Sequence, residues 1–257
     1  MNRREFIIGS VAFALSPTVG FGKSISDHND ELNDLLEFSK TCKICNIKYG
    51  FVNFNPRPYQ IEYFKNLLES KTFVCRKCRQ CGATTMNLIY AHWIAERHPE
   101  KKVILVYNKR MMVHDAKNMF NSMFYCNPSK WNENLPNVEF VTYDSLYREL
   151  EQSIFTRTSG DKYIEFSSKY FDPNVVLIFD EYAFMPYGNI VLNVVDSNKT
   201  IWVSTPNEPN DILWGNGKSY GKFNRMKITG EQVFPQYRLE EFKKCLGMEI
   251  YNQEIQV

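Results

Sequence analysis

A mostly parallel α/β sheet flanked by helices is the fold class that the sequence predicts, on three observations. Short apolar segments alternate with segments of helical periodicity, which is typical of parallel strands joined by crossover helices. A glycine-containing turn, residues 78–82, separates one apolar segment from a helical one. The continuously apolar segment Val175–Phe179 ends in two adjacent carboxylates, Asp180 and Glu181. The sheet should therefore carry polar groups where its strands end.

The elements follow in order along the chain. Leu32, Leu35, Leu36 and Phe38 have helical spacing, and the turn-rich stretch 53–58 should break the chain before the next helix. The expected helices are Tyr59–Glu69, Met86–Arg97, Met111–Met123 and Asp144–Glu151. The expected strands are Thr72–Val74, Val103–Tyr107, Val138–Tyr143, Val175–Phe179 and Thr200–Ser204. Uninterrupted apolar character indicates central strands that are covered on both faces.

Three regions are expected. Residues 1–24 form a leader, 25–55 a helical and linker segment, and 56–257 the main α/β domain. The leader has paired arginines, Arg3 and Arg4, before a short apolar run, as in a twin-arginine export signal. No convincing cleavage site follows, and the run is too short to span a membrane. A cytoplasmic location is favoured, and export remains the alternative.

Composition adds two limits. The net charge is only +2, so any nucleic-acid-binding surface has to be local. The seven cysteines are an odd number, which argues against a complete disulfide framework. The pairs Cys42–Cys45 and Cys75–Cys78 have the spacing of a zinc ribbon. The second pair lies inside the turn discussed next, so reduced cysteines without a metal are favoured.

The turn between Thr72–Val74 and Met86–Arg97 partly matches the phosphate-binding pattern G-x-x-x-x-G-K-[ST]. Gly82 and Thr84 fit, whereas Ala83 stands where the lysine belongs. A strand, a glycine turn and a helix N-terminus direct backbone N–H groups at a phosphate. Lys77, or Arg76 or Arg79, would supply the missing cation.

The two carboxylates complete the parts required for phosphoryl transfer. Asp180 is expected to bind Mg²⁺ through water, together with the hydroxyl of Thr84 or Thr85. Glu181 is expected to be the general base that orients the attacking water. The sequence therefore predicts an ATPase of the P-loop class, with ATP as substrate and Mg²⁺ as cofactor.

Two further groups are weaker signals. Ser204, Thr205 and Asn207 lie at the carboxyl end of the strand Thr200–Ser204. Ligands bind at such strand ends in open α/β folds, and helicase-like motors sense the γ-phosphate there. The pair Tyr59-Gln60 precedes the loop, and a glutamine amide can both donate to and accept from an adenine edge.

Together these motifs resemble the ATPase domain of the large terminase subunit, the DNA-packaging motor of tailed phages. The resemblance runs from about Phe38 to the C-terminus, and its most specific segment is Asp180-Glu181-Tyr182-Ala183-Phe184-Met185-Pro186. Tyr251-Asn252-Gln253-Glu254 resembles the segment that closes the domain. The resemblance implies that Lys77 takes the place of the missing loop lysine. Lys77, Glu181 and Arg79 are the expected catalytic residues, and Arg79 is expected to act in cis on the γ-phosphate because a guanidinium can span two oxygens. The implied nucleotide-binding residues are Arg57, Tyr59, Gln60, Cys78, Gln80, Cys81, Gly82, Ala83, Thr84 and Thr85.

The resemblance also implies partners: double-stranded DNA, a portal protein, a small terminase subunit and other copies in a ring. The chain stops where the family's nuclease domain should begin, so no DNA cleavage is expected from it, and a separate nuclease chain is a possible partner. Two alternatives stay open. One is a helicase-like ATPase, although a second motor domain has no room here. The other is a P-loop remnant that binds nucleotide without packaging, which Ala83 favours.

Overall fold

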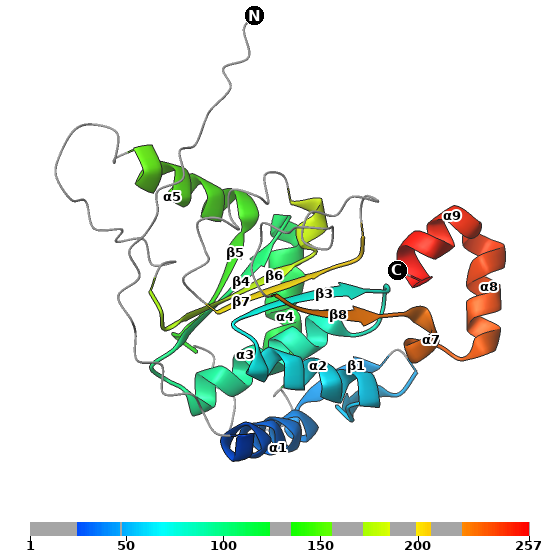
Figure 1. Ribbon diagram of the computed structural model, residues 1–257, viewed down its shortest axis with the longest axis horizontal. Helices are drawn as coiled ribbons and strands as arrows, with labels where there is room; N and C mark the ends of the chain where they lie inside the picture. The colour runs from blue at the N-terminus through cyan, green and yellow to red at the C-terminus, as the bar shows by residue number, and fades with distance from the viewer. Residues whose placement is uncertain are drawn as a thin grey trace, which may run out of the picture.

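A six-stranded parallel sheet forms the centre of the molecule (Figure 1). The computed structural model describes residues 25–46, 48–123, 135–155, 172–185, 199–206 and 223–256. The strands run in the order β5, β4, β6, β7, β3, β8. Their bounds are β3 (Thr72–Lys77), β4 (Lys102–Tyr107), β5 (Val138–Thr142), β6 (Val175–Asp180), β7 (Lys199–Ser204) and β8 (Asn224–Ile228). The predicted fold class is confirmed, and β6 is fully buried between β4 and β7, as its apolar sequence predicts.

Helices cover both faces of the sheet, because successive side chains of each strand point to opposite faces. On one face the strands pack against the helices α1 (Ile25–Thr41), α2 (Pro58–Glu69), α3 (Ala83–Arg97) and α4 (Arg110–Ser122). On the other face they pack against α5 (Tyr143–Phe155) and the short η3 turn (Tyr182–Phe184). Figure 1 shows α5 on the side of the sheet opposite α1 to α3. This alternation of side chains between the two faces also determines which residue at the end of each strand faces the loop before α3.

The N-terminal segment departs from the expected helix and linker. After α1 the chain forms an antiparallel hairpin of β1 (Lys43–Asn46) and β2 (Gly50–Asn53). Each strand has only four residues, and its two apolar residues are adjacent, so no alternation stands out in the sequence. Leu35 and Phe38 of α1 belong to the same buried cluster as the central strands. Segment 25–55 is therefore packed onto the sheet.

The C-terminal part adds elements that the sequence did not predict. The edge strand β8 pairs with β3, and three short helices follow: α7 (Gly230–Val233), α8 (Gln236–Leu246) and α9 (Met248–Tyr251). The π-helical turn η4 (Asn252–Gln256) then brings the chain back beside the carboxyl end of β3. β8 was missed because an edge strand with alternating exposure needs few apolar residues.

The strand order places three predicted polar segments side by side. β6, β7 and β3 are neighbours, and their parallel pairing aligns Asp180 with Val203 and Ser204 with Arg76. The segments after these strands, which carry the carboxylates, the small hydroxyls and the glycine turn, therefore meet at one edge of the sheet. Among the described residues, no helix is both long and apolar enough to cross a membrane. The leader 1–24 lies outside the described residues.

Candidate nucleotide-binding site

The turn 78–82 joins β3 directly to α3 and has the backbone of an anion-binding loop. Gln80 and Gly82 have positive φ angles of 61° and 81°, and Gly82 is the N-cap of α3. The helix begins at Ala83 rather than at Met86, so its first N–H groups lie within the turn. Free N–H groups at a helix N-terminus favour a bound anion. A Cβ on Gly82 would lie 3.3 Å from Nε2 of Gln60, in a conformation that L residues rarely adopt.

Neighbouring elements hold this loop in place through its backbone. The N–H of Cys78 donates to the carbonyl of Ile228 (2.8 Å), and the N–H of Arg79 donates to the carbonyl of Glu254 (2.8 Å). The Tyr59 hydroxyl donates to the Cys81 carbonyl at 2.9 Å. Strand β8, the turn η4 and helix α2 thus each fix one part of the loop.

The predicted adenine-binding segment lies at the start of α2, next to the loop. The Gln60 amide oxygen accepts from the Arg57 N–H at 2.9 Å, and its Nε2 lies 3.5 Å from the Cys81 carbonyl. Arg57 donates to the carbonyl of Val233 in α7 at 2.8 Å. These contacts place Arg57, Tyr59 and Gln60 beside the loop, while their contact with a base stays a prediction.

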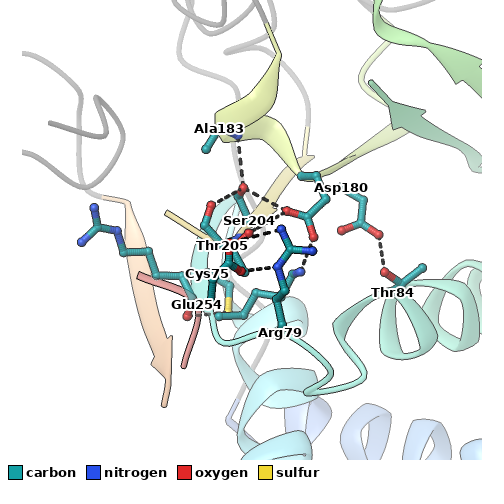
Figure 2. A network of polar contacts seen from close by, with 11 residues as sticks. Cys75, Arg79, Thr84, Asp180, Ala183, Ser204, Thr205 and Glu254 are labelled. Carbon is teal, nitrogen blue, oxygen red and sulfur yellow. Dashed lines mark hydrogen bonds and ion pairs between the residues drawn. The ribbon is translucent and has the colours of Figure 1, made fainter. Parts of the chain in front are cut away.

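Thr84 and Asp180 form the centre of the site. The Thr84 hydroxyl donates to Oδ2 of Asp180 at 2.6 Å, which links the first turn of α3 to the end of β6 (Figure 2). Burial raises the pKa of the Asp180 carboxyl, although the charge of Lys77 and the Thr84 hydrogen bond oppose that shift. Thr85 points elsewhere, toward the sulfur of Met119 at 3.9 Å. Of the two hydroxyls considered, the structure therefore brings Thr84 to the carboxylate.

The residues present fit a magnesium ion at this point. Oδ1 of Asp180 is buried and has no hydrogen-bond partner among the described residues, although a carboxylate oxygen in such a place ordinarily has one. Mg²⁺ is commonly held by one or two protein oxygens, substrate phosphates and water. Within the described segments, no three His, Cys, Asp or Glu side chains are grouped so as to hold a metal ion by themselves.

Glu181 lies between the end of β3, which leads into the phosphate loop, and the end of β7. Its Oε1 accepts from the Lys77 ammonium. Its Oε2 accepts from the hydroxyls of Ser204 (3.3 Å) and Thr205 (3.2 Å) and from the Thr205 N–H (3.3 Å). Glu181 has a positive φ of 62°, unusual for a residue with a long side chain. Strained backbone conformations of this kind concentrate at functional sites.

Lys77 is charged and almost enclosed, with only 6% of its surface exposed. Burial alone would lower the pKa of its ammonium, but the negative charges of Glu181 and Asp180 outweigh that effect and raise the pKa. The ammonium thus lies near both carboxylates, at the base of the loop that lacks the usual lysine. The structure brings Lys77 to the position where the sequence required a cation, and its contact with phosphate stays a prediction.

Arg79 is bound by a residue that the sequence analysis did not assign to the site. Its guanidinium forms two contacts with the Glu254 carboxylate, one of them at 3.2 Å, in addition to the backbone bond between the same residues (Figure 2). In the same turn, Gln253 donates to the Pro206 carbonyl at 3.0 Å. The C-terminal turn η4 therefore contacts both the phosphate loop and the segment after β7. Asn207, predicted to belong to that segment's motif, lies outside the described residues.

Three cysteines lie under the loop. Cys75 of β3, Cys78 and Cys81 are all buried. Interaction between the Cys78 and Cys81 thiols raises the pKa of Cys78 and lowers that of Cys81. The Lys77 charge also lowers the pKa of Cys81. From the sequence, Cys75 and Cys78 were a candidate zinc pair and Cys78 and Cys81 were predicted to belong to the phosphate loop.

Replacing Thr84 by valine tests the proposed metal site. Thr84→Val keeps the shape of the side chain and removes the hydroxyl, so we expect Mg²⁺-dependent nucleotide binding to weaken while metal-free binding changes little. The matched control is Thr85→Val, whose lost hydroxyl contacts the Met119 sulfur among the described residues. Titrations with fluorescent ATP, with and without Mg²⁺, measure both. Equal behaviour of the two variants would remove Thr84 from the metal site. The variant also costs Asp180 a hydrogen bond, so thermal unfolding is measured alongside.

The pairing of Arg79 with Glu254 separates two roles of the arginine. Arg79→Lys keeps the charge and loses the planar fork that can span two oxygens. If Arg79 acts on the γ-phosphate, Arg79→Lys lowers turnover, whereas Glu254→Gln frees the guanidinium and leaves turnover unchanged. We expect this outcome. Equal losses of turnover and of thermal stability in both variants would instead show that Arg79 only tethers the loop.

Comparison with solved structures supports the fold at low sequence identity. The HK97 bacteriophage large terminase superposes with a TM-score of 0.53 at 11% identity, over 88% of this chain and 54% of that chain. The Thermus phage P74-26 large terminase ATPase domain gives 0.51 at 14%, over 88% and 96%. The UvsW helicase of bacteriophage T4 gives 0.51 at 13%, over 80% and 68%. The sequence matches no protein-family model and no curated protein. The chain thus has the fold shared by large-terminase ATPase domains and a phage helicase.

Proposed function

We propose that this chain is an ATP-hydrolysing motor of the large-terminase type, which drives double-stranded viral DNA into a prohead. One observation carries the proposal: Glu181 lies between Lys77, at the phosphate loop, and the Ser204–Thr205 pair, beside the partly buried Thr84–Asp180 contact. A base, a cation and a metal carboxylate next to one phosphate loop are the parts of a nucleotide hydrolase. The similarity in fold to terminase ATPase domains supports the choice among such enzymes.

The residues would divide the reaction as follows. N–H groups of residues 80–82 and of the first turn of α3 bind phosphate oxygens, and the Lys77 ammonium offsets their charge. Thr84 and Asp180 would hold Mg²⁺, which when bound neutralises charge on the phosphates. Glu181 orients the attacking water and accepts its proton. The hydroxyls of Ser204 and Thr205 hold the Glu181 carboxylate in position for that step.

The same network suggests how hydrolysis would reach the rest of the molecule. Thr205 contacts Glu181, and the next residue, Pro206, accepts a hydrogen bond from Gln253 in the C-terminal turn. A change at the γ-phosphate that moves Glu181 would therefore be passed to the segment after β7 and to η4. This is the path by which we expect the motor to couple hydrolysis to DNA movement.

The partners of a packaging motor belong to the proposal. They are double-stranded DNA, a portal protein, a small terminase subunit, further copies of this chain in a ring, and a separate nuclease chain. Such a motor would act in the host-cell cytoplasm.

ATP turnover by the purified full-length chain tests the proposal. We expect Mg²⁺-dependent hydrolysis that double-stranded DNA accelerates. A helicase-like ATPase, favoured by the similarity to UvsW, would instead respond to single-stranded DNA and separate duplex strands. A remnant, favoured by Ala83, would bind ATP without hydrolysing it. Absence of both binding and turnover would contradict all three hypotheses.

A further inference from the structure

On the side of the sheet that α3 covers, three buried polar atoms have no hydrogen-bond partner among the described residues. They are Oδ1 of Asp180, the hydroxyl of Tyr107 and the amide nitrogen Nδ2 of Asn87. The three residues are 2%, 1% and 0% exposed, respectively. Buried polar groups in folded proteins are ordinarily paired with protein or with ordered water. The proposed ATPase chemistry uses Asp180 but gives no role to Tyr107 or Asn87.

The register of the sheet places Tyr107 beside Asp180. They are the last residues of the adjacent strands β4 and β6 and are partners in the parallel pairing of those strands. Paired residues of neighbouring strands point to the same face of a sheet. The preceding pair on this face, Leu105 and Ile178, belongs to the buried cluster that includes α3. Burial raises the pKa of Tyr107 and the Asp180 charge adds to that shift, in agreement with this closeness.

Helix α3 brings Asn87 to the same carboxylate. Asn87 follows Thr84 by three residues, so the two share one face of the helix. Thr84 on that face donates to Oδ2 of Asp180 at 2.6 Å. Oδ1 of Asn87 accepts from the buried Tyr63 hydroxyl at 2.6 Å, which fixes the direction of the amide. Burial raises the pKa of Tyr63 and the Asp180 charge adds to the shift, so this pair also lies within reach of the carboxylate charge.

We propose that Asn87 and Tyr107 hold a buried water molecule against Oδ1 of Asp180 and through it fix the direction of the metal carboxylate. The water accepts from Nδ2 of Asn87 and from the Tyr107 hydroxyl, and it donates to Oδ1. Three hydrogen bonds are typical of a buried water. Asn87 and Tyr107 are thus positioning residues that act on a bound metal through Asp180.

The carboxylate can serve this water and a metal at once. Each carboxylate oxygen has two lone pairs, so Oδ1 can accept from the buried water and also from a water bound to Mg²⁺. Thr84 holds the other oxygen, Oδ2. A carboxylate held at both oxygens keeps its direction, and groups that orient a metal ligand in this way contribute to metal affinity. The water site is independent of the proposed function, whereas its effect on Mg²⁺ rests on that function.

A crystal structure of the full-length chain without nucleotide, at a resolution that shows ordered water, tests the site directly. We expect one water at about 3 Å from each of Oδ1 of Asp180, Nδ2 of Asn87 and the Tyr107 hydroxyl. A direct hydrogen bond between Tyr107 and Asp180, or density without water between the three atoms, would overturn the proposal.

The second experiment measures the effect on Mg²⁺. Binding of fluorescent ATP is titrated with Mg²⁺, and the Mg²⁺ concentration of half-maximal effect is compared between variants. We expect Tyr107→Phe to raise it about tenfold, the lower end of the loss for a group that orients a metal ligand, with metal-free binding unchanged. The matched control, Tyr90→Phe, removes the hydroxyl of another buried tyrosine, near Glu31 of α1, and should behave as the parent. A parent-like Mg²⁺ requirement in Tyr107→Phe would overturn the positioning role.

Asn87→Leu tests whether the two residues act through one water. Leucine keeps the size of the side chain and removes the amide, so this variant should also need more Mg²⁺. Because either change disrupts the same water, the double variant with Tyr107→Phe should be no weaker than the weaker single variant. Losses that multiply in a double variant shown to be folded by thermal unfolding would overturn the shared water. If the parent shows no Mg²⁺-dependent ATP binding, the proposed function fails, and the crystal structure alone decides the water site.

Discussion

Lys77→Ala is expected to lower ATP turnover by about 10²–10³-fold, the loss typical of removing one well-placed charge donor from a transition state. Ala83 cannot reach a phosphate, and Lys77 is the ammonium that the structure places at the base of the loop beside both carboxylates. Its raised pKa favours the charged ammonium. Single-turnover hydrolysis at saturating ATP measures the loss.

The controls separate charge from packing. Lys77→Arg keeps the charge and should retain more activity than Lys77→Ala, and Lys101→Ala should match the parent chain. Lys77 is also the cation paired with Glu181 in a nearly enclosed setting, so its removal leaves a carboxylate without its partner. Thermal unfolding therefore accompanies the kinetics. Turnover at the parent rate by a folded Lys77→Ala would assign the cation role to Arg76 or Arg79.

The sheet could be predicted from sequence because its central strands have an uninterrupted apolar pattern. Val175–Phe179 is covered on both faces, and a strand in that position is almost always composed of apolar residues. The edge strand β8 and the hairpin of β1 and β2 are short and partly exposed. Many different sequences can form such elements, so no characteristic pattern identifies them. Their positions depend on contacts with distant segments, which a local pattern does not record.

The candidate site likewise has some residues that the sequence could predict and others that depend on the fold. Thr84, Asp180 and Glu181 stand at fixed distances from a strand end, and the parallel topology is enough to bring them together. The choice of Thr84 over Thr85 depends on which side of α3 faces β6, and that requires the packed helix. The pairing of Arg79 with Glu254 joins residues far apart in sequence through the fold of the C-terminal helices. The sequence marked Glu254 only as part of a closing segment.

Glu181→Gln is the change expected to separate binding from chemistry most completely. Glutamine keeps the length of the side chain and its ability to accept hydrogen bonds from Ser204 and Thr205, but it cannot accept the proton of the attacking water. We therefore expect ATP to bind with Mg²⁺ about as tightly as in the parent chain, while single-turnover hydrolysis falls by about 10²–10⁴-fold, the usual contribution of a general base. The lost charge also releases Lys77, which becomes free to contact phosphate.

Asp180→Asn is the matched comparison, because it neutralises the adjacent carboxylate. Asp180 lies on the face of β6 toward α3, where Thr84 donates to it and where its second oxygen is left for a metal. Neutralising it should weaken the Mg²⁺-dependent part of ATP binding itself, in the same assay in which Glu181→Gln binds normally. An equal loss of binding in both variants would show that the base and the metal carboxylate have been assigned to the wrong residues. Parent-level hydrolysis by Glu181→Gln would remove Glu181 from the chemical step.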